Sequence, residues 1–210
     1  MTRRLTAALI TLAISTCLVG CAGKTKFPAY YTLHVPPAVD MPVAGGTRAS
    51  VAVREFQAPA YLRQGAIVYR TSPEQIGFYQ YHRWAVDPRE FLTNAIIDRL
   101  RATGRFAGVK MYDGRSDANF ILSGRLEKLE EVDYEGGVRV EVALSAQITD
   151  PRAGKTVWAN STSESARVEK RNVPAVVAKM SQAMDRAIQK LLASLTVPTT
   201  TSLGPGKESP

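Results

Sequence analysis

The spacing of apolar and polar positions predicts that this chain contains both strands and helices. Alternating or β-rich stretches occupy residues 27–35, 50–56, 66–70, 76–84, 108–112, 118–133, 138–149 and 155–168. The last three stretches are separated by Gly136-Gly137 and by the Asp150–Gly154 segment, which are strong turn signals. Short turns join antiparallel strands, so we expect a three-stranded antiparallel meander in the C-terminal part of the chain.

Two segments have helical spacing. Asp87 and Pro88 are a typical helix start, apolar residues follow at helical spacing, and Gly104 is a typical stop. Asn172 is the expected cap of a second helix, whose single apolar stripe runs from Val173 to Leu195. Together these elements predict an α+β fold, with an antiparallel sheet and both amphipathic helices packed on one of its faces.

The first 21 residues have a different pattern, that of an export signal. Arg3 and Arg4 precede an apolar run at residues 5–18, which is too short to be a comfortable membrane span. Gly20 lies directly before Cys21, as in the lipobox of bacterial lipoproteins. We therefore predict a signal peptide at residues 1–20, lipidation of Cys21, a tether at 21–26, one domain at 27–195 and a disordered Thr-, Pro- and Gly-rich tail at 196–210.

Composition narrows the class of protein further. The chain has two cysteines; Cys17 leaves with the signal and Cys21 would carry lipid, so the mature domain can form no internal disulfide. The formal net charge of +8 falls by two when Arg3 and Arg4 are removed, and the remaining basic residues are scattered. Nucleic-acid binding would require a basic stripe, so we expect no such partner.

Candidate catalytic chemistry is sparse. His34 and His82 are the two histidines, and neither has a partner that the sequence identifies. No nucleophile motif and no metal-ligand spacing is present, so we expect neither an enzyme nor a cofactor. An acidic run at Glu127, Glu130, Glu131, Asp133 and Glu135 is most simply a solvated strand end.

The aromatic stretch at residues 76–84 allows two interpretations. Aromatic residues favour strands that are covered, and strict alternation would place Tyr79 and His82 on opposite faces. Tyr and Trp also dominate the energetics of protein interfaces, so the same strand could form a docking patch. The neighbouring Arg70, Arg83 and the bend at residues 59–62 favour the docking patch slightly.

An ordered series of segments resembles a known family. The series comprises the lipobox and residues 30–33, 51–53, 59–62, 67–70 and 78–85. These segments are similar to those of the ABC-type transport auxiliary lipoproteins, the group that contains the paraquat-inducible-protein C lipoproteins. The likeness extends more loosely through the predicted meander, and Val86-Asp87 departs from the family pattern.

The resemblance implies a function in lipid traffic across the cell envelope. It implies a periplasm-facing lipoprotein whose partner is a mammalian-cell-entry (MCE) domain protein and, through it, an ABC permease and ATPase. Ala22 follows Cys21 where an aspartate would retain the protein at the inner membrane of enteric bacteria, so we expect anchoring in the outer membrane.

The contact residues expected for that partner are those of the aromatic stretch and its surroundings: Tyr61, Leu62, Arg70, Tyr79, Tyr81 and Trp84. Two alternatives stay open at this point, a structural lipoprotein of another envelope assembly and a lipid carrier with its own cavity. The sequence also leaves open whether the protein forms a homo-oligomer.

Overall fold

The computed structural model describes residues 26–37, 47–115, 117–134 and 136–196. The signal peptide, Cys21 and most of the tether and tail lie outside these ranges. The described strands and helices are, in chain order, β1 (Ala29–Tyr31), β2 (Thr47–Val53), η1 (Ala60–Gln64), β3 (Ala66–Arg70), β4 (Ile76–Trp84), α2 (Pro88–Ala102), β5 (Phe106–Met111), β6 (Phe120–Asp133), β7 (Val138–Asp150), β8 (Lys155–Arg167) and α3 (Val173–Ala193).

The eight strands form one sheet, and it is mixed. The order is β1-β4-β3-β6-β2-β5, with β7 beside β6 and β8 beside β7. β6, β7 and β8 pair consecutively and antiparallel, whereas β1/β4, β2/β5, β2/β6 and β3/β6 are parallel pairs. The expectation of a purely antiparallel sheet is therefore wrong. The parallel pairs join strands that are distant in sequence, so no turn signal could announce them.

β6 is the central strand of the molecule. On one edge it pairs with β7 along almost its whole length. On the other edge it pairs first with β2, where Val53 lies opposite Leu122, and later with β3, where Val68 lies opposite Glu130. The intervening segment that carries η1 leaves the sheet between these two pairings, after an isolated bridge from Gln57 to Arg125.

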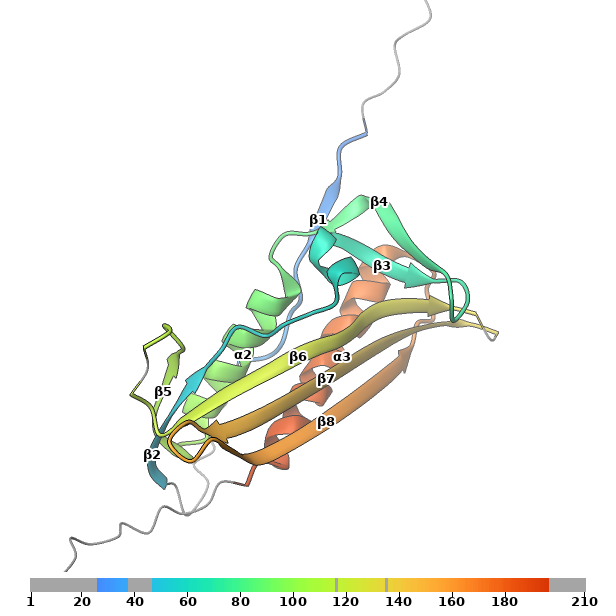
Figure 1. The fold of residues 1–210 in the computed structure, drawn as a ribbon. Helices are drawn as coiled ribbons and strands as arrows, with labels where there is room; N and C mark the ends of the chain where they lie inside the picture. Colours follow the sequence, from blue (N-terminus) through green and yellow to red (C-terminus); the bar gives the residue numbers. More distant parts are fainter. Residues whose placement is uncertain (1–25, 38–46, 116, 135, 197–210) are drawn as a thin grey trace, which may run out of the picture.

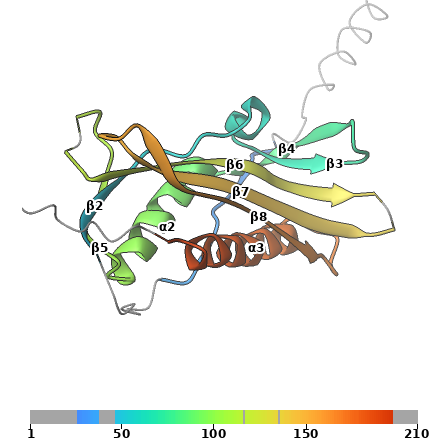
Figure 2. The same cartoon turned by 60° about the horizontal axis from the view of Figure 1, so that its bottom comes forward.

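The two helices cover the same side of the sheet (Figure 2). Asp87 accepts a hydrogen bond from the backbone N–H of Arg89 (2.8 Å), and Asn172 accepts one from Ala175 (2.9 Å), so both predicted helix caps are confirmed. The apolar stripe of α3 is buried against β6, β7 and β8, as expected from its spacing. Arg99 of α2 and Asp185 of α3 form an ion pair that joins the two helices.

The first strand is shorter than the β-rich pattern at residues 27–35 predicts. β1 ends at Tyr31, and the chain then passes toward the helices. The backbone N–H of His34 donates to Ser181 Oγ on α3 (3.1 Å), and Leu33 is buried in the core. Side-chain contacts with helices thus replace the strand pairing that residues 32–35 would otherwise make.

Alternation along β7 separates the two faces of the sheet. Val138, Val140, Val142 and Leu144 are buried against the helix layer. The residues between them lie on the opposite face, which neither α2 nor α3 covers (Figure 1). This second surface of β6, β7 and β8 is called the open face below.

Candidate functional site

The aromatic stretch of β4 belongs to a side-chain cluster that four strands build. The Tyr31 hydroxyl lies 3.0 Å from Nδ1 of His82, and the rings of Tyr79 and His82 meet edge to face at 5.6 Å. The Tyr69 ring lies 5.0 Å from that of Tyr79, and the Tyr79 hydroxyl donates to Glu131 Oε2 (2.8 Å). This aromatic cluster therefore draws its members from β1, β3, β4 and β6.

The contact between Tyr79 and His82 shows that β4 does not alternate regularly. Ala66 pairs with Arg83 and Val68 pairs with Phe78, so the register of β4 against β3 shifts between these pairs. An irregularity of this kind changes which face a side chain occupies. The strict alternation expected for residues 76–84 is therefore wrong at this point.

Glu131 is held in an unusual environment within this cluster. Its side chain is buried, which raises the pKa of the carboxyl group, and the nearby Asp133 raises it further. The hydrogen bond from Tyr79 acts in the opposite direction. Burial also raises the pKa of the Tyr79 hydroxyl, as does its bond to the carboxylate, so Tyr79 remains protonated and a donor.

Glu130 is buried on the other face of the sheet. It pairs with Glu141 of β7, which lies on the open face. Because paired residues project on the same face of a sheet, the Glu130 side chain also lies on the open face. The Arg70 guanidinium donates from Nε to Glu130 Oε1 at 2.7 Å, and it also donates to the carbonyl of Pro73. Oε2 of Glu130 has no hydrogen-bond partner.

These two glutamates correct the prediction of a solvated strand end. Glu130 is 0% exposed and Glu131 is 6% exposed. The acidic run does reach a strand end, since β6 ends at Asp133, but Glu130 and Glu131 have a neighbouring strand on both edges and are not solvated. One sequence signal could have indicated that these glutamates are buried. Arg70, a basic residue, ends the apolar strand β3 with which β6 pairs.

The six residues predicted as partner contacts do not form one surface. Leu62 and Trp84 are buried in the core, which corrects their assignment as contacts: bulky apolar side chains beside a bend and at a strand end fill the space under the sheet. Tyr79 belongs to the aromatic cluster. Tyr81 instead lies beside Lys26, whose ammonium is 4.6 Å from the centre of the ring.

Tyr61 and Arg70 are the two predicted contacts that the structure brings together. The Tyr61 hydroxyl donates to the carbonyl of Glu127 (3.3 Å) and interacts with the Arg70 guanidinium. Burial raises the pKa of Tyr61, and the charge of Glu130 raises it further. These side chains border the open face where η1 returns to β3.

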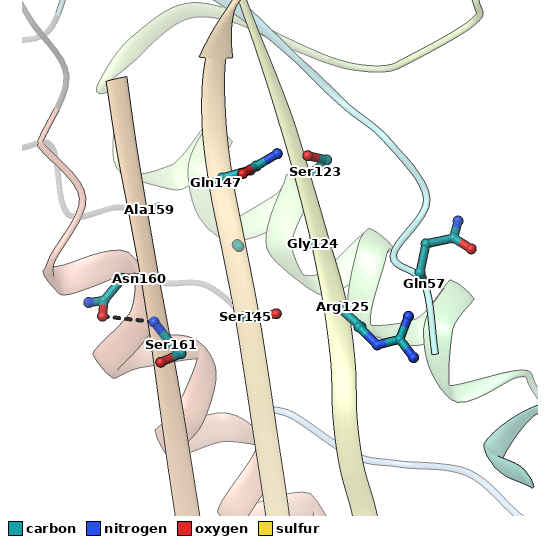
Figure 3. A pocket seen from close by; sticks show the side chains of 10 residues that line it. Gln57, Ser123, Gly124, Arg125, Ser145, Gln147, Ala159, Asn160 and Ser161 are labelled. Carbon is teal, nitrogen blue, oxygen red and sulfur yellow. Dashed lines mark hydrogen bonds between the residues drawn. The ribbon is translucent and has the colours of Figure 1, made fainter. Parts of the chain in front are cut away.

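The open face contains a shallow cavity that sequence reasoning missed (Figure 3). Its volume is about 680 Å³, and residues of β6, β7 and β8 line it together with Gln57. The lining residues share small or amide side chains apart from one arginine: Gln57, Ser123, Gly124, Arg125, Ser145, Ala146, Gln147, Ala159, Asn160 and Ser161. The hydroxyl and amide groups among them, together with Arg125, can hydrogen-bond to a bound chain.

Gly124 shapes the floor of this cavity. A Cβ atom at this position would lie 2.3 Å from Cε1 of Phe56 and 2.7 Å from the carbonyl oxygen of Ser145. Phe56 is fully buried, so its ring occupies the space that a side chain at position 124 would need. Glycine therefore lets the core pack directly beneath β6.

Groups that could carry out chemistry are not brought together in the described part of the chain. Within residues 26–37, 47–115, 117–134 and 136–196, no group of three or more His, Cys, Asp or Glu side chains is placed to hold a metal ion. His34 lies in the segment after β1 and His82 on β4, and the side-chain hydrogen bond of His82 is with the Tyr31 hydroxyl. Among the same residues, no helix has the length and apolar character needed to cross a bilayer.

Comparison with known proteins decides the family. The family model described as "ABC-type transport auxiliary lipoprotein component" matches residues 31–191. The chain belongs to this family. No sequence among curated proteins matches this auxiliary lipoprotein.

Solved structures confirm its fold. Protein XCC0632 from Xanthomonas campestris, of family DUF330, is 17% identical with a TM-score of 0.66, over 78% of this chain and 92% of that one. A second structure, titled as an uncharacterized protein, is 16% identical with a TM-score of 0.62, over 80% of this chain and 97% of that one. The resemblance inferred from the lipobox and residues 30–85 is thereby confirmed.

Proposed function

We propose that this auxiliary lipoprotein is a non-catalytic adaptor that fastens an MCE-linked ABC lipid transport assembly to the outer membrane. The observation that carries the proposal is the family match over residues 31–191, which covers all of the described elements except the first two residues of β1 and the last two of α3. The described titratable groups support it, because Glu130, Glu131 and Tyr79 are engaged in internal pairs that hold strands together.

The anchor in this proposal is lipid on Cys21, which is followed by Ala22. Two or more acyl chains bind a bilayer stably where a single chain binds only reversibly. Alanine after the lipidated cysteine supports the outer membrane as the destination, because an aspartate there would retain the protein at the inner membrane of enteric bacteria. The anchored end of the domain is then the end at which β1 begins.

The docking surface in this proposal is the open face together with the edge of β8. β8 pairs with β7 alone among the described strands, so one side of its backbone is free to pair with another chain. From Thr156 to Ser163 it carries no charged residue, and charge is what usually protects such an edge. An extended segment of the MCE protein can add to this edge, with side chains resting in the cavity of the open face.

Tyr61 and Arg70 border the same face and remain predicted contacts. Tyr79 contacts Glu131 in the aromatic cluster, Tyr81 lies beside Lys26, and Leu62 and Trp84 are buried. The proposal therefore places the partner across β6, β7 and β8 rather than on the aromatic strand itself.

Photo-crosslinking in the native envelope tests the docking surface. A crosslinking residue at Ser161, exposed beside the cavity, is expected to capture an MCE-domain protein identified by mass spectrometry. The matched control is Ala178, exposed on α3 on the opposite side of the sheet, which is expected to give no such product. Capture from Ala178 but not from Ser161, or capture of unrelated envelope proteins alone, contradicts the proposal.

A further inference from the structure

Exposed apolar side chains lie along the sheet edge formed by β1 and β4, where the described chain begins. Among the described residues, five large hydrophobic side chains are exposed, and four of them lie in or directly beside β1 and β4: Phe27 (80% exposed), Tyr30 (63%), Phe78 (39%) and Val86 (40%). β1 and β4 are parallel neighbours at one end of the sheet (Figure 1). We refer to this set of side chains, with Lys26 and Arg83, as the β1–β4 corner.

Two cations accompany these apolar residues. Arg83 lies opposite Tyr30 in the parallel register, so the two side chains project from the same face. The Lys26 ammonium lies over the ring of Tyr81 at 4.6 Å. Arg83 donates a hydrogen bond to the carbonyl of Gln64, and within the described residues neither Lys26 nor Arg83 has a carboxylate partner. Their positive charge is therefore available to an anionic surface.

The position of the lipidated cysteine decides what this corner faces. Cys21 is five residues before Lys26, and five residues span at most about 17 Å when fully extended. Phe27 is six residues and Tyr30 nine residues from Cys21, so the acyl chains hold the bilayer within about 20 Å of Phe27 and about 30 Å of Tyr30. A protein partner on the same corner would have to fit between the domain and the membrane that anchors it.

We propose that the β1–β4 corner rests on the bilayer that holds the lipid of Cys21. Tyr30 enters the interface with its hydroxyl toward water, as tyrosine favours, and the wholly apolar ring of Phe27 inserts beside it. Lys26 and Arg83 reach the anionic phosphates while their apolar stems lie along the surface. The inference rests on the lipid anchor of the proposed function and is independent of the transport partner. Its consequence is a domain fixed in orientation rather than free to swing on its tether.

The absence of another thiol in the mature chain allows a direct test. Cys17 leaves with the signal and Cys21 is acylated, so a cysteine introduced elsewhere can be spin-labelled selectively. Gln80→Cys places the label on β4 at an exposed position of the corner, and Ser163→Cys places it at an exposed position of β8. Each full-length lipidated protein is reconstituted into vesicles of phosphatidylethanolamine and phosphatidylglycerol that contain no other protein.

The measurement is the collision rate of each label with a water-soluble nickel complex and with oxygen. At position 80 we expect a nickel collision rate several-fold below that at position 163, with oxygen collisions maintained. Adding Phe27→Ser and Tyr30→Ser is expected to raise the nickel collision rate at position 80 to that at position 163. The protein should still float with the vesicles. Equal rates at the two positions in a protein that floats overturn the inference.

Two further outcomes separate this inference from the proposed function. Protection of position 80 that appears only after an envelope protein is added assigns the corner to protein binding and overturns the inference. Failure to float, with no acyl mass on Cys21, removes the anchor and overturns both. Flotation without protection leaves the anchor intact and removes this inference alone.

Discussion

The buried pair of Arg70 and Glu130 gives the sharpest test of how the sheet is held together. The Glu130 side chain is 0% exposed and that of Arg70 is 17% exposed, with Nε 2.7 Å from Oε1. Arg70→Met removes the guanidinium and keeps most of its apolar stem. The carboxylate is then left buried without its hydrogen-bonded partner, in a strand that links β3 to β7.

The expected loss follows from the desolvation of that carboxylate. Removing one partner of a buried ion pair costs about 3–5 kcal/mol, because the remaining charge stays uncompensated. Lys128 lies near enough to interact with Glu130, so we expect the lower end, about 3 kcal/mol. Glu130→Gln is expected to cost only about 1 kcal/mol, since the partly exposed Arg70 can turn to water. The double variant should cost less than the two single variants together.

Urea unfolding of the unlipidated mature chain, followed by circular dichroism, measures these differences. The control is Lys110→Met, which breaks an ion pair to Asp117 whose side chains are 48% and 93% exposed, and it should change stability by at most about 0.5 kcal/mol. If Arg70→Met costs no more than this control, the buried carboxylate does not depend on Arg70. Additive losses in the double variant would likewise refute the reasoning.

Three further predictions concern the cavity floor, the aromatic cluster and the anchor. Gly124→Ala should lower the free energy of unfolding by about 1–3 kcal/mol, because the added methyl group overpacks against Phe56. The control Gly108→Ala, whose added Cβ meets only an ordinary 3.8 Å contact, should change this free energy little in the same urea experiment. Equal effects of the two variants would contradict the packing argument. Because burial raises the pKa of Glu131, the folded state binds this proton more readily than the unfolded state, so its ionisation costs stability above a pH of about 4.5. Glu131→Gln should therefore stabilise the protein at neutral pH, with the gain shrinking as the pH falls toward 4.5, and a gain that grows on acidification would refute this sign. Cys21→Ser should abolish acylation by mass spectrometry and release the domain from membranes by fractionation; unchanged processing and fractionation would disprove the anchor.

Local structure was predictable from the sequence because local patterns determine it. The strands at residues 66–70 and 76–84 have the predicted bounds, and the caps Asp87 and Asn172 make the predicted hydrogen bonds. Alternation shows that a segment is a strand, but it does not identify the neighbour of that strand. The parallel pairing of β6 with both β2 and β3 was therefore missed.

The site was less predictable for a related reason. In the sequence alone, Glu130 and Glu131 look like part of a solvated acidic run. Their partners Arg70 and Tyr79 lie on strands about 50 to 60 residues away in sequence, so no local pattern indicates the pairing. The cavity on the open face carries no distinctive motif, since its serines, alanines and amides are ordinary residues of an exposed strand. The exposed corner at Phe27 and Tyr30 could have been suspected from the aromatic residues that follow the lipobox, but only the structure shows that β1 leaves them uncovered.

The central place of β6 also constrains how the chain reaches its native state during export. β3 and β4 form one paired unit and β2 and β5 form another, and among the described strands only β6 connects the two units. A polypeptide that crosses a membrane from its N-terminus delivers both units before the strand that unites them. Contacts that close long loops are slow to form. The sheet that joins the two units can therefore be completed only after residue 133 has emerged.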